Sequence, residues 1–263
     1  MASPIYILTP TFSEEVLDSA IFVSSTSAMF AKFNMIKPQP KDTWKAGSLS
    51  MATIDVDLTT AQTVQCAALL FSTTETGTTY TVTAGATQGA STYSSGTLTL
   101  NAFFNSPYTI RRHLIHIPAT PQTHRWWRFS VDAQTVTILT VGNLFLGTYW
   151  RPNVEYGASF GGQLSGDLVY TDGGTVVATA PWREFAREYT FHLMANTELE
   201  HEENMQYLLY RRAKRKPILV VRDLSNPFYT QQRVVWGYIT DIAPITIEKY
   251  NQWRCRVTIR GMI

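Results

Sequence analysis

The chain has 263 residues, of which 44% are apolar and 16% are charged, and its formal net charge is +2. This length suffices for one large domain or two ordinary domains with buried cores. The charged fraction lies below the usual ~25%, which favours a protein that covers part of its surface in an assembly. A net charge this small excludes electrostatic capture of nucleic acid as the default function.

Targeting and metal-binding signals are weak throughout the sequence. The N-terminal stretch MASPIYILTPTFSEE has neither a basic region nor a long apolar run, so we expect no signal peptide. No stretch approaches the ~18 apolar residues of a transmembrane helix, so we expect no membrane insertion. Cys66 and Cys255 are far apart and offer no paired zinc ligands. Two free thiols suit synthesis in the cytoplasm, and we predict no metal and no cofactor.

Residues 1–150 are predicted to form a β-sandwich or jelly roll. Only three residues between Lys45 and Arg111 are charged, and Thr, Ser, Val, Ala and Gly dominate there, which favours strands and short turns. The stretch SMATIDVDL alternates, and its core face is expected to hold Ala52, Ile54, Val56 and Leu58. The other expected strands are TVQCAALLFS, TTYTVTAG, GTLTL, RRHLIHIP, RWWRFSV and TVTILTVGNLFLGTYW. Many short strands are typical of a sandwich.

The stretch THRWWRFSVD places two tryptophans side by side between arginines. Neighbouring residues of a strand point to opposite faces, so Trp127, Phe129 and Val131 are predicted to face the core. Trp126 and Arg128 then share the outer face. We expect another domain or a second subunit to cover Trp126, and both residues are predicted interface residues.

Residues 151–166 are Gly-rich and polar and are predicted to be a linker, followed by a second domain over 167–263. The Asp-Gly-Gly sequence at 172–174 supplies the positive φ of a tight turn and predicts a hairpin over 167–180. We expect this hairpin to add a strand to a neighbouring subunit. Its predicted interface residues are Leu168, Tyr170 and Val176.

One helix is predicted, and it begins at the capping box TELE. Thr197 caps the helix, Glu200 reaches back, and Pro217 ends it. Its buried face is expected to hold Leu199, Met205, Leu208, Leu209 and Arg212. The strand before it, REFAREYTFHLM, is expected to bury Phe185, Tyr189 and Phe191. The later stretches ILVVRD, RVVWGYITDI, PITIEKY and WRCRVTIRG predict a four-stranded meander, which makes this domain α+β.

Several stretches resemble tail-tip proteins of long-tailed bacteriophages. MATIDVDLTTAQTVQCAALLFSTTETGTTYTV resembles the opening of a discoidin-like, galactose-binding-type jelly roll, and RWWRFSV with VTILTVGNLFLGTYWRPN is similar to a later pair of its strands. The phrase LFLGTYWRP at 144–152 is similar to a strand ending in phage tail proteins of this type. Residues 167–263 resemble the split-barrel domain of distal tail proteins through their aromatic strand, acidic-to-basic helix and closing meander. The resemblance implies a mainly β virion protein with a carbohydrate-binding-like module.

No complete catalytic motif occurs in the sequence. HEEN at 201–204 resembles the start of a zinc-protease motif, but Met205 stands where the second histidine would be. The five histidines show no shared ligand spacing. Asp55 and Asp57 share a strand face, and a glycan-cleaving enzyme would need one of them shielded, with a raised pKa. Neighbouring Thr and Ser favour solvation of both, so we predict no catalytic residues and no enzyme.

Aromatic residues, at 13% of the chain, are the most informative class for binding. Sugar sites combine aromatic faces with a few polar groups. The predicted ligand-binding residues, which lie in expected loops, are Trp44, Tyr93, Phe104 and Tyr108. Packing and interface roles are the alternatives for each. The basic run RRAKRK at 211–216 is predicted to complement the helix dipole, with a subunit contact as the alternative.

The leading hypothesis is a structural component of a phage tail tip, located in the virion and synthesised in the host cytoplasm. It would form a ring with copies of itself and contact the tail tube and hub proteins. Two alternatives are kept: a module whose main role is binding a host glycan, and a glycan-cleaving enzyme. The first is motivated by the aromatic residues and the second by the paired carboxylates.

Overall fold

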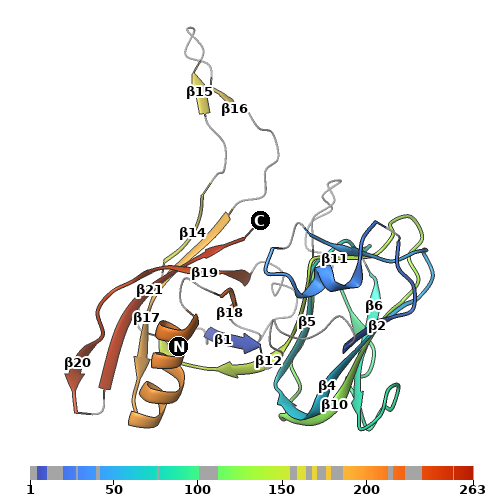
Figure 1. Cartoon of the computed structure of the whole chain (residues 1–263). Helices are drawn as coiled ribbons and strands as arrows, with labels where there is room; N and C mark the ends of the chain where they lie inside the picture. Colours follow the sequence, from blue (N-terminus) through green and yellow to red (C-terminus); the bar gives the residue numbers. More distant parts are fainter. Residues whose placement is uncertain are drawn as a thin grey trace. The chain divides into compact units, whose positions relative to one another are not determined.

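The computed structural model describes two compact units within the chain (Figure 1). The sandwich unit comprises residues 6–150 and 221–234, and the helix unit comprises residues 1–5, 151–220 and 235–263. The residues described are 5–10, 20–27, 29–39, 42–75, 77–100, 112–154, 159–163, 168–170, 176–178, 186–212, 216–222, 233–250 and 252–262. Both units are built mainly from antiparallel strands, so the mainly β class predicted from the sequence is confirmed.

Two sheets make up the sandwich unit. The first runs in the order β1 (Ile5–Pro10), β12 (Asn143–Trp150), β5 (Cys66–Ser72) and β9 (Arg112–His116). The second runs in the order β2 (Ile21–Val23), β4 (Ala52–Val64), β10 (Gln122–Val131), β6 (Thr79–Gly85) and β7 (Tyr93–Ser94), with β8 (Leu98–Thr99) also on β6. The strands β3 (Trp44–Lys45) and β11 (Thr140–Val141) form a short ladder, and η2 (Lys32–Ile36) is a 3-10 helix.

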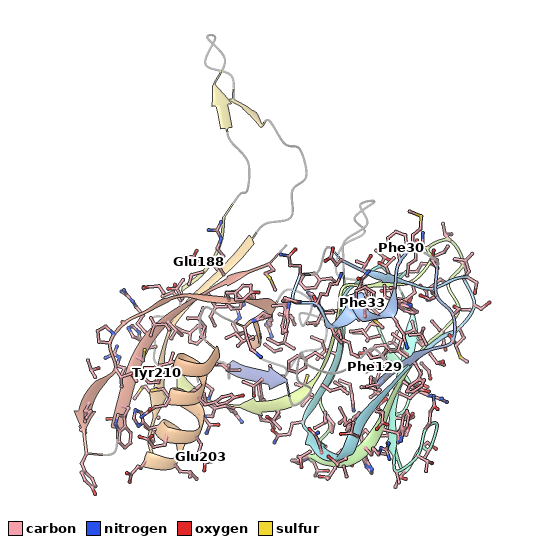
Figure 2. All side chains as sticks on the ribbon, in the orientation of Figure 1. Phe30, Phe33, Phe129, Glu188, Glu203 and Tyr210 are labelled. Atoms are coloured by element: carbon pink, nitrogen blue, oxygen red, sulfur yellow. The ribbon has the colours of Figure 1, made fainter. Side chains whose placement is uncertain are left out.

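The core of the sandwich unit confirms the alternation predicted for its strands. Trp127, Phe129 and Val131 of β10 are buried, as predicted, and Phe129 is labelled in Figure 2. The predicted core face of β4 is buried as well, namely Ala52, Ile54, Val56 and Leu58. These side chains pack in one cluster with Leu69 and Leu146 of the first sheet, so the two sheets enclose a single apolar core.

The helix unit is an open sheet with one long helix among the described residues. The sheet runs in the order β13 (Asn153–Val154), β17 (Ala186–Ala195), β21 (Gln252–Gly261), β19 (Val234–Ile242) and β18 (Ile218–Arg222). The strand β14 (Ser159–Gln163) also pairs with β17, and β20 (Thr246–Lys249) also pairs with β21. The helix η3 (Glu200–Arg212) lies against β17.

The structure differs from two expectations for this unit. The segment 151–166, predicted to be a linker, contributes β13 and β14 to the sheet, because backbone groups can complete a ladder even where glycines supply no side chain. The predicted four-stranded meander is also modified. In a simple meander β19 would pair with β20. Here both β19 and β20 pair with β21, at successive positions along that strand.

The helix begins as the capping box predicts. The Glu200 backbone N–H donates to Thr197 Oγ1 over 3.1 Å, and the Asn196 N–H donates to Glu200 Oε2 over 2.9 Å. The predicted buried face is confirmed at Met205, Leu208 and Leu209 and is wrong at Leu199, which is exposed. Leu199 lies in the first turn of the helix, two residues after the cap Thr197, and its side chain points to solvent. His201 is buried instead and stacks on Trp253, with ring centroids 4.6 Å apart. The side chain of Arg212 is not among those that the structure describes, so its predicted burial stays a prediction.

Candidate functional site

The outer face of the second sheet gathers charged and aromatic side chains from three strands. Because the alternate residues of β10 are buried, Trp126 and Arg128 point away from the core. The ladder pairs Trp126 with Asp57 and Arg128 with Asp55 on β4. Phe22 of the edge strand β2 pairs with Asp55 from the other side. We call these five residues, together with Arg125, the Phe22–Trp126 surface.

A β-bulge brings Arg125 onto this surface. Two steps along β10, from His124 to Trp126, correspond to five steps along β4, from Gln62 to Asp57. The extra residues of β4 break the regular register beside Arg125. Within the bulge, Thr59 adopts a positive φ of 64° and its N–H donates to Asp57 Oδ1 over 2.8 Å. The carboxylate is thereby fixed from its own strand.

Two aromatic rings form the apolar part of the surface. The centroids of Phe22 and Trp126 lie 5.6 Å apart with an interplanar angle of 42°. Phe22 is 40% exposed and Trp126 is partly exposed. The Arg125 guanidinium lies 5.7 Å from the centroid of the Trp126 ring, within cation–π range. The pair therefore presents an apolar patch with a cation at its border.

Ion pairs fix the charged groups of the surface. Arg125 donates through Nε and Nη2 to the two carboxylate oxygens of Asp57, over 2.7 Å each. The hydrogen bond from the Arg125 guanidinium holds the pKa of Asp57 below its usual range. Arg128 donates in the same two-pronged manner to Asp55 over 2.5 and 2.7 Å, and Gln88 Nε2 donates to Asp55 over 2.9 Å. Both arginines are thus neutralised and oriented.

The expectation that Asp55 is solvated was wrong, because only 5% of the residue is exposed. The Arg128 guanidinium and the Gln88 amide donate the hydrogen bonds that water would otherwise give to this carboxylate. Asp57 is the more exposed of the two carboxylates, and its pKa is lowered. A general acid for glycoside cleavage needs a raised pKa. The lowered pKa of Asp57 does not fit that role, and both carboxylates hold arginine side chains in place.

Of the four predicted ligand-binding residues, Trp44 and Tyr93 lie in the part of the chain that the structure describes. Trp44 was predicted to offer a platform, but it lies in β3 without exposed surface, and its Nε1 donates to Thr26 Oγ1 over 3.0 Å. A ring with no free face cannot stack on a ligand, so Trp44 is a core residue. Tyr93 lies in β7, partly exposed, and its hydroxyl is 2.5 Å from Nε2 of His116. Phe104 and Tyr108 lie outside the described residues.

The predicted interface residues of the hairpin lie on a described ladder. β15 (Leu168–Tyr170) pairs with β16 (Val176–Ala178), with Leu168 opposite Ala178 and Tyr170 opposite Val176. Their side chains lie outside the description, so their interface role stays a prediction. The same holds for RRAKRK at 211–216, of which 213–215 are outside it.

Among the described residues, no group of three or more His, Cys, Asp or Glu side chains is arranged to hold a metal ion. Cys66 and Cys255 are both buried free thiols. Burial raises the pKa of the Cys255 thiol to about 11, which suits a packed and unreactive side chain. None of the described helices combines the length and apolar character that crossing a bilayer requires.

Sequence reasoning missed Phe22 and the segment that follows it. The strand β2 has only three residues, too few for alternation to be recognised. The usable signal is the density of Phe and Lys between residues 22 and 45, which includes Phe22, Phe30, Phe33, Lys32, Lys37 and Lys45. Only the fold shows that Phe22 reaches Trp126, which is 104 positions away in the chain.

Comparisons with known proteins give a limited picture. No protein-family model and no curated protein sequence matches the chain. Among solved structures, a family 32 carbohydrate-binding module from Clostridium perfringens NanJ in complex with galactose is 10% identical, covering 54% of this chain and 99% of that one, with a TM-score of 0.37. The family 32 module of AlyQ in complex with 4,5-unsaturated mannuronic acid is 17% identical, covering 53% and 96%, with a TM-score of 0.38.

A GH29 fucosidase from Ruminococcus gnavus in complex with fucose is 12% identical, covering 49% of this chain and 25% of the fucosidase, with a TM-score of 0.39. Similarity at this level identifies no function, so the site must be judged by its own contacts. These matches also give no support to the tail-tip role, which remains a proposal.

Proposed function

We propose that this chain is a glycan-binding protein and that the Phe22–Trp126 surface contacts the sugar. The observation that carries this proposal is the partly exposed Phe22–Trp126 pair, bordered by guanidinium groups held in fixed orientation. A sugar ring has an apolar face that packs on aromatic rings, and hydroxyl groups that need nearby polar partners. The surface offers both within one patch.

The surface is also prepared for binding before a ligand arrives. Trp126 and Arg128 stand on a central strand that pairs with β4 on one side and β6 on the other. Asp57 and Asp55 lock the two arginines, so few side-chain rotations remain to be lost on binding. Preorganisation of this kind improves affinity by lowering the entropic cost. Because both carboxylates are engaged by arginines, we propose binding without turnover.

A glycan array with the full chain tests this proposal, followed by titration calorimetry on the best ligand. Trp126→Ala and Phe22→Ala should each weaken binding by at least roughly tenfold, the effect expected when a central aromatic contact is removed. Tyr210→Ala is the matched control, since Tyr210 is an exposed aromatic residue on η3 (Figure 2). Absence of binding to every glycan, or full affinity in Trp126→Ala, would contradict the proposal.

Assembly into a phage tail tip is kept as a second candidate because of the hairpin. Among the described strands, β15 and β16 pair only with each other. Two strands alone have outer edges that can accept a further strand, and an added strand is a common mode of subunit contact. This arrangement supports contacts between copies in a ring, or with tail tube and hub proteins.

Sedimentation velocity over a wide concentration range tests this second candidate. The full chain should associate as concentration rises, and replacing 168–178 by a Gly/Ser segment of equal length should abolish association. Leu199→Ser, which removes an exposed apolar side chain of the same unit, should leave association intact. A chain that stays monomeric at every concentration, and does not enter particles in a tail-assembly assay, would rule out the assembly role.

A further inference from the structure

Three lysines lie over three phenylalanines in the segment between β2 and β3. The Lys32 Nζ is 5.6 Å from the centroid of the Phe22 ring, and the Lys37 Nζ is 4.7 Å from that of Phe33. The third pair is Lys45 and Phe30, at 5.6 Å. The three rings are 36–41% exposed, and Phe30 and Phe33 are labelled in Figure 2. We call these six residues the Lys–Phe strip.

The strip is held by the structure beneath it. The Ser27 N–H donates to the Lys45 carbonyl over 2.9 Å, and Asn34 Nδ2 donates to the Thr43 carbonyl over 3.0 Å. Met35 of η2 and Trp44 of β3 are both fully buried. The strip therefore rests on packed, hydrogen-bonded backbone, which fixes the backbone positions from which its side chains extend.

The strip carries the positive charge that the Phe22–Trp126 surface lacks. Its one acidic neighbour in the described part of 20–46 is Asp42, which lies 3.6 Å from the Lys37 Nζ, with both side chains about 40% exposed. The Lys32 Nζ donates to the Ile21 carbonyl over 2.6 Å. Residues 20–46 contain four lysines, with Lys41 as the fourth, and one aspartate, which gives the segment a formal net charge of +3. An occupant with negative charge would therefore be favoured.

Phe22 belongs to both surfaces. Its ring contacts the Trp126 ring, with the centroids 5.6 Å apart, and the Lys32 Nζ lies 5.6 Å from its centroid. A chain of sugars that packs on the Phe22–Trp126 surface would therefore continue past Lys32 along the strip. Carboxylate or sulfate groups on that chain would form charge-assisted hydrogen bonds with the lysines.

We infer that the glycan bound by this protein is an acidic polysaccharide. Its sugar rings pack on the exposed aromatic side chains, and its negative groups lie against Lys32, Lys37 and Lys45. This inference rests on the proposed glycan-binding function and adds the chemical class of the ligand.

The test compares polygalacturonate with its fully methyl-esterified form, which has the same backbone without the charges. By affinity electrophoresis or calorimetry, the full chain should bind the charged polymer at least about tenfold more tightly, with a gap that narrows as salt is added. The triple variant K32Q/K37Q/K45Q should lose this preference and keep the weaker binding of the ester. K249Q, at an exposed lysine of β20, is the control.

Each outcome separates the inference from the function beneath it. Equal binding of both polymers, lost in Trp126→Ala, would overturn the acidic class and leave glycan binding standing. Binding of neither polymer, nor of sulfated dextran, would remove both. Equally tight binding of poly-glutamate would overturn the glycan assignment and point to an acidic protein partner.

Discussion

The burial of the Asp55 carboxylate depends on partners that are distant in the sequence. Two strands hold it: its own β4, and β10, which supplies Arg128. Gln88, from the turn after β6, completes the set. The local sequence around Asp55 is polar and predicts solvation, whereas the arginine that buries it lies 73 positions away. The alternation of the strand predicts on which face of the sheet Asp55 lies. It does not predict that Arg128 is its partner.

Arg128→Met should destabilise the sandwich unit, because it leaves the Asp55 carboxylate buried with only Gln88 as a donor. The expected loss is roughly 2 to 3 kcal/mol in the free energy of unfolding, measured by urea denaturation. The double variant D55N/R128M should recover part of the loss, since a neutral amide costs less to bury. A loss of under about 0.5 kcal/mol in Arg128→Met would mean that solvent already screens the pair.

Glu75 joins two loops at one end of the sandwich and gives stability a pH dependence. Its carboxylate accepts hydrogen bonds from the Thr135 hydroxyl over 2.6 Å, and from the N–H groups of Thr135, Val136 and Thr137 over 2.6 to 2.9 Å. The Thr135 hydroxyl, followed by the three amides, lowers the pKa of Glu75 from its ordinary 4.5 to about 2.

Because the folded pKa is below the unfolded one, the stabilisation from Glu75 is complete above pH 4.5 and lost as pH falls toward 2. Glu75→Gln should therefore be less stable than the native chain at pH 6, and the difference should shrink between pH 4.5 and 2. Denaturation curves across that range measure the difference. Glu203→Gln, at an exposed position of η3, should show no such convergence. A stability difference between Glu75→Gln and the native chain that does not change with pH would contradict this role of the Glu75 carboxylate.

At the scale of elements, the length of a strand decided whether the sequence could predict it. The strand β10 has ten residues, and its alternation correctly assigned both faces, including the separate positions of Trp126 and Trp127. The strand β3 has two residues, so no period could be detected and Trp44 was assigned to a loop. The helix η3 was predictable from its capping residues, which act locally, and its stacking of His201 on Trp253 was not.

Position 237 on β19 requires a glycine, and the surrounding sequence pattern does not predict this requirement. In the β19–β21 ladder it lies opposite Gly261, and a Cβ placed on it would lie 2.0 Å from the Arg260 carbonyl oxygen. Gly237→Ala should force the two strands apart and cost about 1–3 kcal/mol in unfolding free energy, seen by urea denaturation. Gly47→Ala is the matched control, because its Cβ would meet nothing closer than 3.4 Å. Equal stabilities of the two variants would refute the strand contact.

At the scale of the whole molecule, the chain does not divide at a single point. The sequence placed a domain boundary at residue 150, and the change in composition there does precede the strands of the helix unit. However, residues 221–234 belong to the sandwich unit, although they follow η3 in the chain. A change in composition marks a boundary between neighbouring segments. It cannot show that a segment far along the chain belongs to the first unit again. Val221 and Val234, at the two ends of this segment, are both buried.

A fragment ending at Trp150 should therefore be an incomplete sandwich, since it lacks 221–234. We expect it to unfold at least about 5 °C below the sandwich transition of the full chain, and to bind a hydrophobic dye that the full chain does not. Appending 218–234 through a flexible linker should restore both properties, and appending a scrambled segment of equal composition should not. A fragment 1–150 as stable as the full chain would show that the returning segment contributes no packing energy to the sandwich.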